Sequence, residues 1–206
     1  MADLRTGTAM VVSLLIKPAR VLAVIALFLL AACGAPRPDP PVSDQREIAA
    51  IAEGILALGP GIDPEEAEAA ARIALLYPRQ LAREWNVTDS ALVHNTKVNL
   101  GLRPRGLCFQ WADDLETRLR QEGFETIEMH RAIANHDVSY RIEHSTVIVS
   151  APGGTISEGM VLDPWRYGGL LFWDETLDDE RYRWVERSEV FAWKRARGLP
   201  EVETGS

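Results

Sequence analysis

The feature that most constrains the fold is a change in the spacing of apolar residues near residue 123. Before it, in segments such as 44–58, apolar side chains recur every three or four residues, which is typical of one face of a helix. After it, short runs rich in β-branched residues alternate between two faces, and Gly or Pro turns separate them. Helices followed by an antiparallel sheet predict the α+β class.

The same pattern predicts where individual elements begin and end. We expect helices at 44–58, 63–77, 78–85, 90–99 and 107–123, and a last helix at 188–197. We expect strands at 124–132, 140–150 and 160–162, the third ending at Asp163-Pro164-Trp165. The helix that begins near Leu107 is expected to pack on the antiparallel sheet.

An apolar run at residues 21–32 follows two basic residues, Lys17 and Arg20. The run is 12 residues long, shorter than the roughly 20 that a membrane-spanning helix needs. A basic segment, a short apolar run and small residues are together typical of a secretory signal peptide. We therefore expect residues 1–32 to be removed.

The run ends in Leu30-Ala31-Ala32-Cys33-Gly34, which resembles the lipobox of bacterial lipoproteins. The resemblance implies cleavage before Cys33 and attachment of several acyl chains to it, which anchor a protein stably in a lipid membrane. Asp at position 34 would imply retention at the inner membrane. Gly34 instead implies the periplasmic side of the outer membrane, within the cell envelope. A plain cleaved signal peptide with an accidental cysteine is the alternative.

The remaining chain is expected to be one acidic domain behind a tether. The proline-rich residues 33–42 predict an extended tether, and residues 43–206 have the length of a single domain. The formal net charge of the whole chain is −8, and the signal peptide carries more basic than acidic residues. The mature protein is therefore more acidic still, which argues against nucleic acid as a partner.

Cys108 is the only thiol left once Cys33 is lipidated. An unpaired thiol in an exported protein is reactive, bonds to another molecule, or is buried and inert. Cys108 lies at the predicted start of a helix, where the helix dipole lowers a thiol pKa and free N–H groups can hold an oxyanion. His144, in a predicted strand, and Asp163, at the end of the next, could serve as the base and its orienting carboxylate.

Two sequence motifs around these residues resemble the transglutaminase-like branch of the papain-like cysteine peptidase superfamily. They are Gly106-Leu107-Cys108-Phe109-Gln110-Trp111-Ala112, and Leu162-Asp163-Pro164-Trp165 with His144 before it. The spacing is 36 residues from Cys to His and 19 from His to Asp, within about residues 100–175. Phe109 departs from the family pattern, in which Trp commonly follows the nucleophile.

The resemblance implies a catalytic site of Cys108, His144 and Asp163 that forms a thioester from an amide, without a cofactor. Attack of water on the thioester would make the protein a peptidase or amidase, that is, a hydrolase. Attack of an amine would make it a transglutaminase-like acyltransferase. The compartment favours a peptide or protein substrate.

Other interpretations of the same residues stay open. Cys108 could be a buried hydrophobic residue, His144 an ordinary strand histidine and Asp163 a turn cap, in a non-catalytic envelope binding or assembly module that reuses the fold. A zinc site of Cys108 with His130, His136 and His144 lacks any closely spaced ligand pair, so no metal is expected. A redox role lacks a resolving cysteine.

Several further residues have two interpretations each. Gln110, Asn95 or Asn99 could complete an oxyanion hole. Arg166 could bind a substrate carboxylate or pair with a carboxylate of the chain. Four tryptophans could line a cleft or belong to the core, namely Trp165, Trp173, Trp184 and Trp193. The helices at 44–99 could be a lid, a cover or ordinary core.

Overall fold

A computed structural model of the chain describes residues 44–203. The predicted signal peptide at 1–32, the predicted lipidated Cys33 and the tether at 33–42 lie outside the described residues. Within the described part, no helix combines the length and the apolar character needed to cross a membrane.

The helices of the described part lie mostly in its first half. Their bounds are α2 Asp44–Ala57, α3 Pro64–Glu84, α4 Ala91–Asn99, α5 Cys108–Arg120 and α6 Arg187–Arg195. The side chain of Asp63 caps α3 by accepting from the backbone N–H groups of Glu65, at 2.8 Å, and Glu66, at 3.1 Å. Satisfying these otherwise free N–H groups fixes where α3 begins.

The predicted break before Pro78 is wrong, because α3 continues through it to Glu84. A proline inside a helix removes one backbone hydrogen bond and costs about 3 kcal/mol. Pro78 is itself buried, together with apolar residues on both sides of it along the helix. Burial of that continuous apolar face offsets the cost of the proline, which is why local propensity misplaces the end of the helix.

Five strands form one antiparallel sheet in the order β4-β3-β2-β1-β5, which confirms the α+β class. Their bounds are β1 Glu128–Ala134, β2 His144–Ser150, β3 Met160–Tyr167, β4 Leu170–Glu175 and β5 Val185–Glu186. A 3-10 helix at Ile156–Glu158 lies between β2 and β3.

The structure corrects the strand predictions in four places. β1 begins at Glu128, later than the predicted 124, and β2 begins at His144, later than the predicted 140. The sequence pattern predicts neither β4 nor β5. β3 does not end at Asp163-Pro164-Trp165 but continues to Tyr167, with a shift in its register against β4 between Asp163 and Tyr167. A proline lacks the N–H that a regular ladder needs, and such an irregularity accommodates it.

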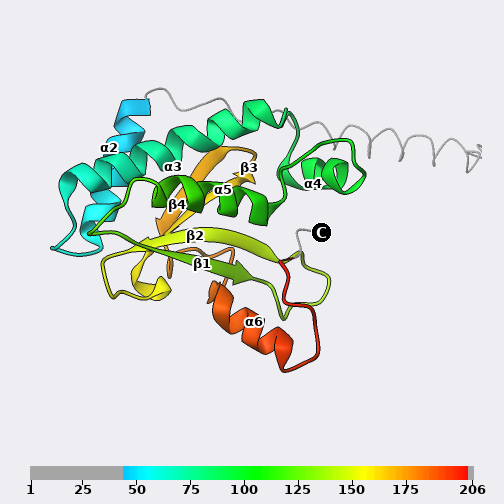
Figure 1. Cartoon of the computed structure of the whole chain (residues 1–206). Coiled ribbons are helices and arrows are strands. Elements are labelled where there is room, and N and C mark those ends of the chain that lie inside the picture. The colour runs from blue at the N-terminus through cyan, green and yellow to red at the C-terminus, as the bar shows by residue number, and fades with distance from the viewer. Residues whose placement is uncertain (1–43, 204–206) are drawn as a thin grey trace, which may run out of the picture. The chain divides into compact units, whose positions relative to one another are not determined.

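The helices α2, α3 and α5 lie on one side of the sheet, and α6 lies on the other (Figure 1). One apolar cluster joins Ile51 and Ile55 of α2, Leu75 of α3, Leu115 of α5 and Val147 of β2. Of the three roles considered for the helices at 44–99, α2 and α3 therefore have that of ordinary core.

The turn between β3 and β4 is fitted closely against α3. Gly169 has a φ of +101°, and a Cβ placed there would lie 2.6 Å from Cβ of Ala82 and 3.0 Å from the carbonyl oxygen of Pro78. Only glycine allows the backbone to approach α3 so closely. The strand that carries Asp163 is thus held against α3 by its own turn.

Candidate functional site

Cys108 is the first residue of α5, and its side chain is 1% exposed. The loop before it is held by Gln110, whose side-chain oxygen accepts from the backbone N–H groups of Gly106, at 2.8 Å, and Leu107, at 3.1 Å. The thiol donates to the carbonyl oxygen of Glu143 at 3.4 Å. The predicted placement of Cys108 at a helix start is confirmed, but the thiol is buried rather than open.

The surroundings of Cys108 keep its thiol neutral. Burial raises the pKa of the Cys108 thiol to about 12, and the negative charges of Asp163 and Glu203 act in the same direction. The backbone N–H groups of Ser145 and Phe109 face the sulfur and oppose this shift. The low thiol pKa expected from the helix start is therefore not present in this conformation, because desolvation is the larger effect.

His144 and Asp163 form a buried pair, as the sequence predicts. Nε2 of His144 lies 2.6 Å from Oδ2 of Asp163, and the two side chains are 1% and 0% exposed. Burial alone would raise the pKa of the Asp163 carboxyl. The positive charges of His144 and Arg166 outweigh burial and hold this pKa below its usual value. Asp163 is therefore ionised and can only accept hydrogen bonds.

The ionised carboxylate fixes the tautomer of the imidazole. Because Asp163 accepts at Nε2, that nitrogen of His144 carries the proton, and in the neutral ring Nδ1 keeps its lone pair. Nδ1 is buried and has no hydrogen-bond partner within the described residues. The pair thus presents an oriented imidazole with one unused basic nitrogen.

Arg166 and Asp179 extend this pair into a buried network. Nε of Arg166 donates to Oδ2 of Asp163 at 2.6 Å, and Nη1 donates to Oδ1 of Asp179 at 3.0 Å. Nε1 of Trp184 also donates to Asp179, at 2.8 Å. Of the two interpretations of Arg166, the structure supports pairing with carboxylates of the chain. Asp179 was not identified in the sequence, where it stands in an acidic loop without any motif.

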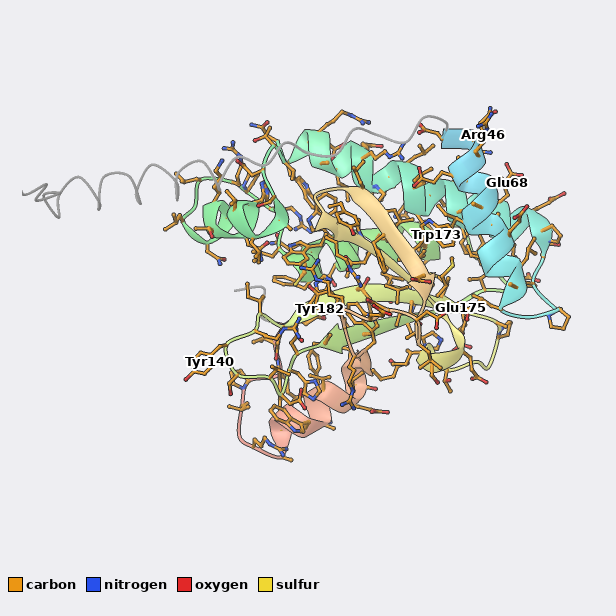
Figure 2. The ribbon with its side chains drawn as sticks, turned by 180° about the vertical axis from the view of Figure 1, so that it is seen from behind. Arg46, Glu68, Tyr140, Trp173, Glu175 and Tyr182 are labelled. Carbon is orange, nitrogen blue, oxygen red and sulfur yellow. The ribbon has the colours of Figure 1, made fainter. Side chains whose placement is uncertain are left out.

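Three aromatic rings enclose the imidazole of His144. Trp165 and Tyr182 lie 4.6 Å from it between ring centroids, and Trp184 lies at 5.3 Å. Tyr182 is labelled in Figure 2, beside the strands of the sheet. Trp165 and Trp184 therefore position the imidazole, whereas Trp173 packs against the main core and Trp193 makes an edge-to-face contact with His136.

Cys108 reaches the backbone on both sides of His144 but not its ring. The thiol bonds the carbonyl of Glu143, and the N–H of Ser145 faces the sulfur. No hydrogen bond joins the thiol to Nδ1 of His144, since that atom has no partner within residues 44–203. The structure thus brings the three predicted residues into one buried region and leaves one link of the triad unmade.

Three of the other candidate polar residues, Asn95, Gln110 and His130, have hydrogen-bond partners of their own. Oδ1 of Asn95 accepts from Nε1 of Trp165 at 2.9 Å, Gln110 caps the loop before α5, and Asn99 is exposed. His130 contacts Ser150 through Nε2 at 2.9 Å. In the part of the chain that the structure describes, no three His, Cys, Asp or Glu side chains gather as metal ligands would.

His94 is a further residue of this region that the sequence reasoning missed. It is 1% exposed, and its Nε2 lies 2.9 Å from the carbonyl oxygen of Arg105. Its ring also packs against Gly106, where an added Cβ would lie only 2.4 Å from the ring. His94 therefore fixes the loop that delivers Cys108.

We expect Gly106→Ala to lower the free energy of unfolding by about 2–4 kcal/mol, because it combines a positive φ with overlap on His94. The φ of Gly106 is +132°. Gly101→Ala is the matched control, since Gly101 also has a positive φ, +72°, but nothing lies within 4 Å of the added Cβ. Urea unfolding of both variants measures the difference, and equal losses would contradict the packing role of His94.

Comparisons with models of protein families, with curated proteins and with solved structures find no match to this chain.

Proposed function

We propose that the protein is a cysteine acyltransferase or amidase that forms a thioester at Cys108, with His144 as the base and Asp163 as the carboxylate that orients it. The observation that carries the proposal is the buried His144–Asp163 pair, which leaves Nδ1 of an oriented imidazole without a partner next to the backbone that contacts the thiol. The motifs around Cys108 and Asp163 add the resemblance to transglutaminase-like enzymes.

In the proposed reaction, the proton of the Cys108 thiol passes to Nδ1 of His144 as the sulfur attacks an amide carbonyl carbon. The C–N bond then breaks, and the amine leaves with the proton that His144 returns. Water or a second amine attacks the thioester, gives up a proton to His144, and the C–S bond breaks as the sulfur regains that proton. Water gives a carboxylic acid, and an amine gives a new amide.

Two backbone N–H groups support the proposal, because they can stabilise the negative charge that develops during the reaction. The N–H of Phe109, in the first turn of α5, faces the sulfur, and so does the N–H of Ser145. N–H groups at a helix start are suited to hold negative charge on sulfur or on a nearby carbonyl oxygen.

The proposed setting is the cell envelope. Residues 30–34 support lipidation of Cys33, and we propose that acyl chains there hold the domain at a membrane, on the periplasmic side of an outer membrane. A peptide or protein would then be the amide donor. This part of the proposal depends on the sequence pattern alone.

A non-catalytic binding or assembly module is the second candidate, and one observation favours it. The thiol is buried, neutral and bonded to the Glu143 carbonyl rather than to His144. Catalysis therefore requires a movement that exposes the sulfur and redirects its proton, whereas a binding module requires none.

The test uses the full chain with a pool of peptide amides as donors and a fluorescent primary amine as acceptor. We expect a hydroxylamine-sensitive acyl adduct on Cys108, seen by mass spectrometry, and ammonia or fluorescent product. Cys108→Ala should abolish all three while the far-UV circular dichroism stays unchanged. Cys33→Ser is the matched control, because it removes the other cysteine and should leave turnover in detergent intact. Equal turnover by Cys108→Ala would refute the proposal.

A further inference from the structure

A short segment after α6 is seated beside the candidate nucleophile. The carbonyl oxygen of Val202 accepts from Nζ of Lys194 at 2.6 Å, and the same Nζ donates to the carboxylate of Glu143 at 2.9 Å. The carboxylate of Glu203 accepts from the hydroxyl of Ser145 at 2.5 Å. Residues 202 and 203 are therefore held on Glu143 and Ser145, the two residues whose backbone contacts the Cys108 sulfur.

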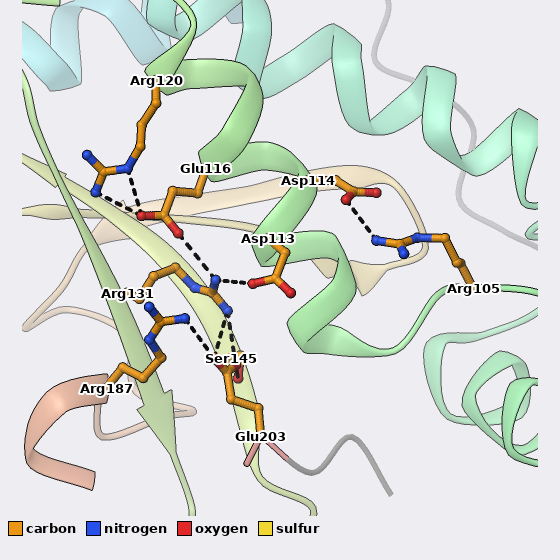
Figure 3. Close-up of polar contacts among 9 residues, drawn as sticks. All are labelled: Arg105, Asp113, Asp114, Glu116, Arg120, Arg131, Ser145, Arg187 and Glu203. Atoms are coloured by element: carbon orange, nitrogen blue, oxygen red, sulfur yellow. Dashed lines mark hydrogen bonds and ion pairs between the residues drawn. The ribbon is translucent and has the colours of Figure 1, made fainter. Parts of the chain in front are cut away.

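The carboxylate of Glu203 occupies a pocket made by side chains of three separate elements. Nη2 of Arg131, in β1, donates to it at 2.9 Å, Nη1 of Arg187, in α6, at 3.2 Å, and Ser145 belongs to β2. The side chain of Glu203 is only 9% exposed, and that of Arg131 is 4% exposed. Figure 3 shows these residues converging on Glu203 next to α5.

The rest of the surroundings keeps Arg131 in place independently of Glu203. Nη1 of Arg131 bonds Asp113 and, at 3.3 Å, Glu116, both on α5. The second terminal nitrogen of Arg131, Nη2, is thereby directed toward Glu203 (Figure 3). If Glu203 left, a fixed guanidinium nitrogen, a second arginine and a hydroxyl would remain as donors for another carboxylate.

The neighbouring residues of the segment are held far less firmly than Glu203. Val202 is 52% exposed, and within the described residues Glu201 pairs only with Arg195, whose side chain is 56% exposed. Leu199 is 46% exposed and is held by one backbone hydrogen bond, from its N–H to the carbonyl of Lys194 at 3.0 Å. The segment contains no helix or strand after α6 ends at Arg195. Beside the thiol, the segment is thus held by the carboxylate of Glu203 and the backbone carbonyl of Val202. A segment held at so few points can leave the domain without unfolding the sheet.

We propose that residues 199–203 close the site by placing Glu203 in this carboxylate pocket, and that an acidic peptide donor puts its own carboxylate there when the segment leaves. The inference rests on the proposed function, whose substrate class it specifies: a peptide with a carboxylate near the amide that Cys108 attacks. The chain's own glutamate then acts as a competitor of the substrate, and the buried thiol belongs to the closed state.

The first test measures the rate at which iodoacetamide alkylates Cys108 in the full chain, followed by mass spectrometry of the peptide that contains it. Glu203→Gln should raise this rate at least about tenfold, because charge-assisted hydrogen bonds to two arginines are weakened. Glu201→Gln is the matched control and should leave the rate unchanged. A Glu203→Gln rate within twofold of the wild-type rate would overturn the proposal.

The second test examines the carboxylate pocket itself. It also checks that faster alkylation of Glu203→Gln does not result from a general loss of stability. Lys194→Met releases the carbonyl of Val202 and the carboxylate of Glu143 but leaves Arg131, Arg187 and Ser145 in place, and it should also speed alkylation. The α-amide of N-acetylglutamate, whose one carboxylate is on the side chain, should slow alkylation of Glu203→Gln. The α-amide of N-acetylglutamine, which has no carboxylate, should not do so at the same concentration. Equal effects of the two additives would overturn the carboxylate pocket.

The third test separates this inference from the proposed function. If Glu203→Gln exposes the thiol but no donor peptide is turned over, the closing segment stands and the enzyme proposal fails. If turnover occurs but peptides with Glu and Gln beside the amide react equally well, the enzyme proposal stands and the acidic substrate class fails.

Discussion

Replacement of Arg166 by methionine is expected to lower the free energy of unfolding by about 3–5 kcal/mol, because it leaves two buried carboxylates without their cation. Arg166 is held between Asp163 and Asp179, and the exposed fraction of its side chain is 2%. Its guanidinium also lies 3.7 Å from the ring centroid of Phe172, so packing is lost as well. Urea unfolding followed by tryptophan fluorescence measures the effect.

Arg195→Met is the matched control for this substitution. Arg195 also forms an ion pair, with Glu201, but both side chains are largely exposed, at 56% and 41%. An exposed pair contributes about 0–1 kcal/mol. If the two variants lost the same stability, the network around Asp163 would not be an essential part of the fold, and our account of its burial would be wrong.

Replacement of Asp163 by asparagine is expected to lower kcat/KM by about four orders of magnitude, the loss seen when an amide replaces the orienting carboxylate of a catalytic triad. Asp163 fixes the proton of His144 on Nε2 and leaves Nδ1 basic. Asparagine can present its N–H to the ring instead, which favours the opposite tautomer and leaves the proton on Nδ1. The loss is measured as turnover of the peptide amides on which the wild-type protein acts under the proposed function.

A fall in activity through misfolding must be separated from a fall through the wrong tautomer. The circular dichroism and the unfolding midpoint of Asp163→Asn give the folded fraction, and the rate is expressed per folded molecule. The pH dependence of kcat/KM is the second readout, since the substitution removes the negative charge beside the imidazole. If more than a tenth of the activity remained with an unchanged pH profile, Asp163 would not orient the base.

The sequence predicts the parts of this site that depend on local order along the chain. The start of α5 at Cys108 follows from the glycine-containing loop before it, and the position of His144 in a strand follows from the alternation after it. The pairing of His144 with Asp163 also follows, because the two residues lie on neighbouring antiparallel strands. The α+β class follows from the change in apolar spacing.

The sequence does not predict contacts that depend on how distant segments meet. Glu203 reaches Ser145 across 58 residues, and Asp179 pairs with Arg166 from a loop that has no pattern of its own. The burial of the thiol depends on several elements packing together, so the expected low pKa was wrong for this conformation. Pro78 and Pro164 were treated as breaks because local propensity does not include the packing that offsets their cost.

The close approach of Gly169 to α3 indicates whether the candidate site could be moved to another protein without the N-terminal helices. The part of the chain that resembles transglutaminase-like enzymes spans about residues 100–175, yet the turn that follows Asp163 rests on Pro78 and Ala82, outside that range. The helices before residue 100 also supply much of the apolar cluster beneath the sheet. A fragment limited to the motifs would carry Cys108, His144 and Asp163 but lack the surface against which the strand of Asp163 is set. A unit to be grafted onto another scaffold would therefore need the helices together with the sheet.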